Sequence, residues 1–96
     1  MIWRPPEAAR REAARALAVR AALPASQRAG TPTGIARAVQ LRDGRPVSLE
    51  TARRMRAFFA RNARFELAAY PSKAWQAWRL WGGTPARDAL QRLHGL

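Results

Sequence analysis

Cysteine is absent from this chain of 96 residues, and lysine, histidine and acidic residues are scarce. Without cysteine the chain forms neither disulfides nor thiolate metal sites, which excludes the usual framework of a small secreted domain. No stretch approaches the roughly 20 apolar residues that span a bilayer, and the first residues lack the apolar run of a signal peptide. We therefore expect a protein that is neither secreted nor transmembrane, located in the cytoplasm or inside a particle assembled there.

The shortage of acid leaves a large positive charge. Six Asp and Glu residues against 18 Lys and Arg residues give a formal net charge of +12. All the basic residues except Lys73 are arginine, a bias typical of a GC-rich genome. Codon usage does not explain why Asp and Glu residues are so few. A domain this basic attracts polyanions, of which nucleic acid is the commonest, with an acidic protein partner or a solvated basic surface as alternatives.

Apolar residues recur at helical spacing, and no segment shows the sustained alternation of a strand. Caps and prolines divide the pattern into five short helices. Their expected starts are Glu7, Thr31, Ser48, Lys73 and Thr84, and their expected ends are Pro24, Asp43-Gly44, Asn62, Trp81 and His94-Gly95. Residues 63–70 either continue the third helix or break and restart it. The sequence thus predicts an all-α fold in a single domain spanning residues 1–96, because this length supports one modest core.

The segment from Ser48 to Asn62 carries the largest side chains and the densest positive charge. At about 100° per residue its apolar side chains share one side and its arginines lie on the other. The predicted inward residues are Ala52, Met55, Phe58, Phe59 and Asn62. Together with the preceding helix, this segment also has the outline of a helix-turn-helix as an alternative architecture.

Most arginines of this segment have no acidic residue at helical spacing, since only Glu50 reaches Arg53 or Arg54. Unpaired arginines on one helix repel one another unless an anion binds, although a solvated charged face is the alternative. Arginines near the preceding turn extend the surface, and Arg37 has the alternative role of binding helix-end carbonyls. The predicted nucleic-acid-binding arginines are Arg37, Arg42, Arg45, Arg53, Arg54, Arg56 and Arg61.

A set of ordered motifs resembles a small module encoded by bacteriophages and prophages. The motifs include Gly30-Thr31, Gly34-Ile35-Ala36-Arg37-Ala38, Arg54-Met55, Phe58-Phe59-Ala60-Arg61, Tyr70-Pro71-Ser72 and Ala77-Trp78-Arg79-Leu80-Trp81-Gly82-Gly83. The resemblance runs from about residue 8 to about residue 90 and implies a phage origin, in the host cytoplasm or the virion, and a shared fold. Relatives usually have histidine at the position of Asn62, so a metal or acid–base role of that histidine does not carry over.

Trp75, Trp78 and Trp81 recur at every third position, so they fan across about 120° of a helix and at least one is expected to be half-exposed. We predict Trp78 and Trp81 as core anchors, because tryptophan supplies bulk that an alanine-rich chain lacks. We predict Trp75 as an exposed stacking platform for a base or an arginine, since relatives of the module tend to lack an aromatic there. The alternative is that Trp75 belongs to the core.

Catalytic signatures are missing from the sequence. It contains no Ser-His-Asp set, no close pair of carboxylates and no phosphate-binding glycine loop. His94 stands alone near the end of the last helix, where a cation suits the helix dipole. We expect no enzyme activity, no metal and no cofactor. The predicted function is association with nucleic acid, mainly DNA, through backbone phosphates; the alternative is a virion structural or assembly protein that docks acidic surfaces of viral structural proteins.

Overall fold

The computed structural model describes residues 1–96 and confirms the all-α fold class. Its α-helices are α1 (Glu7–Ala22), α2 (Pro32–Arg42), α3 (Leu49–Arg61), α4 (Lys73–Leu80) and α5 (Gly83–Gln91). Two 3₁₀ helices, η1 (Ala25–Gln27) and η2 (Ala63–Leu67), interrupt the connections. The strands β1 (Ile2–Trp3) and β2 (Val47–Ser48) pair antiparallel, with Trp3 opposite Val47. Strands of two residues are too short to show as an alternating pattern.

The structure confirms the side-chain caps that the sequence predicts at the starts of α2 and α3. The Thr31 hydroxyl accepts from the Gly34 amide at 3.1 Å. The Ser48 hydroxyl accepts from the Thr51 amide at 3.2 Å, and α3 begins at the next residue. After α2, Gly44 has a φ of +72°, the left-handed conformation that ends a helix and that glycine adopts without strain.

The start of α5 differs from the prediction. Gly82, not Thr84, precedes the helix, and Thr84 lies inside its first turn. The Thr84 hydroxyl donates to Glu66 at 2.8 Å and accepts from the Trp78 indole at 3.2 Å. Thr84, which the sequence predicts as a helix cap, therefore bonds groups from η2 and α4 instead. These bonds connect α5 to both elements.

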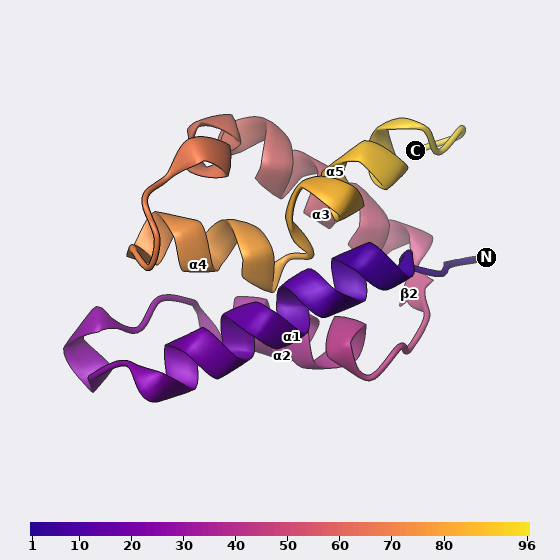
Figure 1. Ribbon diagram of the computed structural model, residues 1–96. Helices are drawn as coiled ribbons and strands as arrows, with labels where there is room; N and C mark the ends of the chain where they lie inside the picture. Colours follow the sequence, from indigo (N-terminus) through magenta and orange to yellow (C-terminus); the bar gives the residue numbers. More distant parts are fainter.

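Helix α1 runs along the molecule and packs against α2, α4 and α5 (Figure 1). Its contact face consists of Ala9, Ala13 and Ala16, all fully buried. Because alanine is small, α1 approaches its neighbours closely, and larger side chains from those helices fill the core. Arg20, which interrupts the apolar stripe in the sequence, donates to the Ala29 carbonyl at 2.6 Å.

The third helix packs on α5 and on the β-ladder, whereas α2 packs mainly on α1. Two helices of a helix-turn-helix pack closely against each other across their turn. Since α2 and α3 pack mainly on other elements, this structure does not favour the helix-turn-helix alternative. Met55 and Phe59 of α3 enter the core, where the Phe59 ring meets the Trp78 ring edge-on at 4.8 Å between centroids.

A buried glutamine fixes the segment before α2. Gln76 of α4 is completely buried, and its side-chain oxygen accepts from the Ala29 amide at 2.9 Å. Its side-chain nitrogen donates to the carbonyls of Gln27 (3.0 Å) and Pro71 (2.8 Å). A buried amide with these three bonds is well satisfied, and it holds two connections against α4.

A half-buried ion-pair network joins η2 to α5. Arg87 bonds Glu66 at 2.9 Å and Asp88 at 2.7 Å. The Thr84 hydroxyl, followed by the Arg87 guanidinium, holds the pKa of Glu66 below its ordinary value. The hydrogen bond that Arg87 donates to Asp88, followed by its bonds to Glu66, raises the pKa of Arg87 against the opposing effect of burial.

The lowered pKa of Glu66 predicts a loss of stability in acid. A carboxyl with a lower pKa in the folded state stabilises the fold above its unfolded pKa, about 4.3 for glutamate, and loses that contribution as pH falls through the folded pKa. We expect thermal melting of the wild type to fall more steeply than that of Glu66→Gln below about pH 4.3. Parallel melting curves for the two proteins across this range would contradict the assigned ionisation.

Candidate nucleic-acid interface

Every acidic residue of the chain is already paired. The ion pairs are Glu7–Arg11, Glu12–Arg79, Asp43–Arg42, Glu50–Arg54, Glu66–Arg87 and Asp88–Arg87. Five arginines thus account for all six acids, and the other basic residues, the majority of the 18, have no acidic partner. The positive charge at the surface is therefore largely uncompensated.

The exposed side of α3 holds four basic residues, which we call the arginine face: Arg53, Arg54, Arg56 and Arg61. All four side chains are exposed, as the sequence predicts. Only Arg54 has an acidic partner, Glu50, at 2.7 Å and four residues away. Both members of that pair are about two-thirds exposed or more, so water and salt screen the interaction and it contributes at most about 1 kcal/mol.

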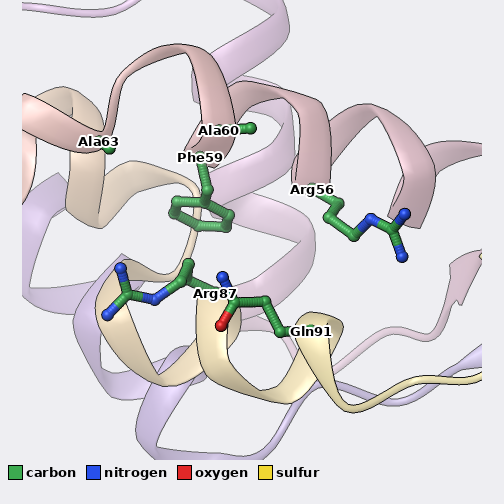
Figure 2. A pocket seen from close by; sticks show the side chains of 6 residues that line it. All are labelled: Arg56, Phe59, Ala60, Ala63, Arg87 and Gln91. Carbon is green, nitrogen blue, oxygen red and sulfur yellow. The ribbon is translucent and has the colours of Figure 1, made fainter.

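One flank of the arginine face borders a cavity of about 300 Å³ between α3 and α5 (Figure 2). The Phe59 ring points from α3 toward α5, and Arg87 and Gln91 project from α5. Arg87 is held by its two carboxylates, whereas Arg56 has no acidic partner. Arg56 therefore supplies the available positive charge on this flank.

The other flank approaches α2 through Arg37. Burial, followed by repulsion from Arg54, lowers the pKa of Arg37, so the two guanidinium groups share one local field. Arg37 donates to the Gln40 side chain, which in turn donates to the Pro46 carbonyl at 2.8 Å. Arg37 thus bonds the Gln40 side chain rather than helix-end carbonyls.

Arg42 and Arg45 have different surroundings. Arg42 pairs with Asp43 at 3.0 Å and lines a small hollow with Arg10 and Arg11 of α1. Arg45 is exposed in the link between α2 and β2 and forms no ion pair. The structure therefore groups Arg42 with α1 rather than with α3, because α2 packs along α1. The predicted arginine set is not one continuous row.

The expectation of an exposed Trp75 is wrong. Only 4% of Trp75 is exposed, because α4 packs on α1 and polar side chains cover the ring. The guanidinium groups of Arg79 and Arg15 lie 4.6 Å and 5.3 Å from its centroid, and the Tyr70 ring meets it edge-on at 4.8 Å. A base has no room to stack on Trp75 in this conformation.

Trp81, which the sequence predicts as a core anchor, packs against the core but is only partly buried. Its ring stacks on Phe58 of α3, with centroids 4.6 Å apart and planes 12° apart. Both rings line a groove of about 600 Å³ bounded by the start of α2, by α4 and by η2. The every-third spacing indicates that one tryptophan is exposed, but it does not identify which one.

The chain matches no protein-family model, and no curated protein or solved structure is significantly similar to it. None of its helices combines the length and the apolar character needed to cross a membrane. No three histidine or acidic side chains gather where they would hold a metal ion.

Proposed function

We propose that this chain is a phage-derived basic helical protein that associates with nucleic acid, chiefly DNA, through backbone phosphates. The observation that carries the proposal is the arginine face on α3, whose charge is largely uncompensated because the acids of the chain are paired. Arg53 and Arg61 are eight residues apart, which places them about 12 Å apart along the helix. Duplex DNA carries one charge per roughly 1.7 Å of its axis, so a helix of this length faces several phosphates.

Contact with the backbone, rather than sequence reading, fits the way the arginines are distributed. They occupy the outer side and both flanks of α3, and α2 and α3 do not form the helix pair that presents a recognition helix to the major groove. Phosphate contacts position a protein without carrying sequence information. We therefore expect similar affinities for duplexes of different sequence.

The proposal predicts a strong dependence on salt. If the four residues of the arginine face each neutralise one phosphate, the slope of log affinity against log salt is about −3.6, which lowers affinity about 150-fold between roughly 50 and 200 mM salt. Fluorescence anisotropy with a labelled mixed-sequence duplex measures this slope. The double variant Arg53→Gln, Arg61→Gln should reduce its magnitude by about 1.8.

The matched control is Arg10→Gln, Arg11→Gln on α1, which removes the same charge from another surface. It should change the slope much less than the α3 variant. Equal effects of the two variants would mean that net charge, not the arginine face, determines binding. Absence of binding at low salt would overturn the proposal in favour of docking to an acidic protein surface.

A further inference from the structure

An aromatic ring interrupts the arginine face at a regular position. Phe58 lies between Arg54 and Arg61 at i, i+4 and i+7 spacing, which places the three side chains along one side of α3. Phe58 is only partly buried, and with its stacking partner Trp81 it lines the groove described above. A hollow with an aromatic wall therefore opens next to the arginine face.

The charged side chains that line this groove, Arg28 and Lys73, are cations. Lys73 is exposed and has no acidic partner, and no acidic residue lines the groove. The Trp81 indole nitrogen forms no hydrogen bond within the protein and faces Gly34, where a Cβ would lie 3.4 Å away. On η2, the Arg64 guanidinium lies over the Phe65 ring at 4.7 Å. The groove thus suits a flat group with acceptor atoms at its edge and negative charge beside it.

We propose that this groove binds an unstacked base of single-stranded nucleic acid while the neighbouring phosphates contact the arginine face. The inference rests on the proposed function and adds a preference for single strands. Along this side of α3, the Phe58 ring lies between the charges of Arg54 and Arg61. Phosphates and bases alternate in a similar way along a nucleic-acid strand. Stacking on an aromatic side chain tolerates every base, because each base has a π-face.

The test compares three probes at low salt: oligothymidylate, an abasic strand of equal length and a mixed-sequence duplex of equal length. All three carry phosphates, but only oligothymidylate offers unstacked bases. We expect the wild type to bind oligothymidylate about 5- to 150-fold more tightly than the abasic strand, the range for one stacked base.

The informative variant is Ala77→Leu, because Ala77 lines the groove and leucine fills it without removing an aromatic or basic side chain. Leucine also favours helix, so α4 should be retained. The preference for oligothymidylate over the abasic strand should disappear, and duplex affinity should stay unchanged. The matched control is Ala18→Leu at an exposed position of α1, which should retain the preference.

Equal affinity of the wild type for oligothymidylate and the abasic strand would overturn base binding, as would a preference that survives in Ala77→Leu. In either case, salt-dependent duplex binding would leave the proposed function intact. Failure of all three probes to bind would overturn the proposed function as well. An acidic peptide that contains Glu and Phe tests the competing partner. If this peptide binds the wild type but not Ala77→Leu, and oligothymidylate does not compete with it, the groove binds an acidic protein partner and the proposal is overturned.

Discussion

Phe59→Ala should lower the free energy of unfolding by about 3–5 kcal/mol, the usual range for a buried phenylalanine. Phe59 is only 3% exposed, and its ring meets both Phe58 and Trp78 edge-on, at 5.4 Å and 4.8 Å. Alanine leaves a cavity between α3 and α4, next to the Trp78 ring. Urea denaturation followed by circular dichroism measures the loss.

The matched control on the same helix is Arg54→Ala, whose side chain is exposed and whose only partner is the exposed Glu50. Its stability should change by no more than about 1 kcal/mol, the upper limit for an exposed ion pair. Its affinity for nucleic acid should fall. Equal losses of stability in the two variants would mean that Arg54 supports the fold and that α3 faces the core differently.

Features that depend on neighbouring residues in the chain were predictable from the sequence. Ser48 caps α3 and Thr31 caps α2 because each hydroxyl reaches an amide three residues later, which needs no tertiary context. Most of the inward side of α3 follows from helical periodicity: Ala52, Met55 and Phe59 are buried as predicted, whereas Phe58 and Asn62 are only partly buried. The arginine face follows from the same geometry.

Features that depend on contacts between distant segments were not predictable. The three bonds of Gln76 include two to groups 47 and 49 residues away, and glutamine carries no local signal for such a role. Periodicity gives the angle of each residue around its helix, but not which neighbouring helix covers that angle. For this reason Trp75 is buried and Trp81 is partly exposed, the reverse of the expectation, and Arg42 lies beside α1 rather than α3.

Because Trp75 is buried, Trp75→Ala tests most directly whether this ring is a stacking surface. Truncation of this buried ring should cost about 3–5 kcal/mol of folding stability, because it removes the contacts with Tyr70, Arg15 and Arg79 and leaves a cavity beside α1. The folded fraction should bind oligothymidylate as the wild type does, because the covered ring offers no face to a base.

Trp81→Ala is the matched comparison, since it removes the same atoms from a partly exposed position on the groove. It should cost less stability than Trp75→Ala, because part of the ring already contacts water, and it should weaken oligothymidylate binding about 5- to 150-fold. Both affinities should be measured at a temperature where circular dichroism shows the variants folded. A stable Trp75→Ala variant with weakened single-strand binding would instead mean that Arg15 and Tyr70 move aside and that Trp75 is the stacking surface after all.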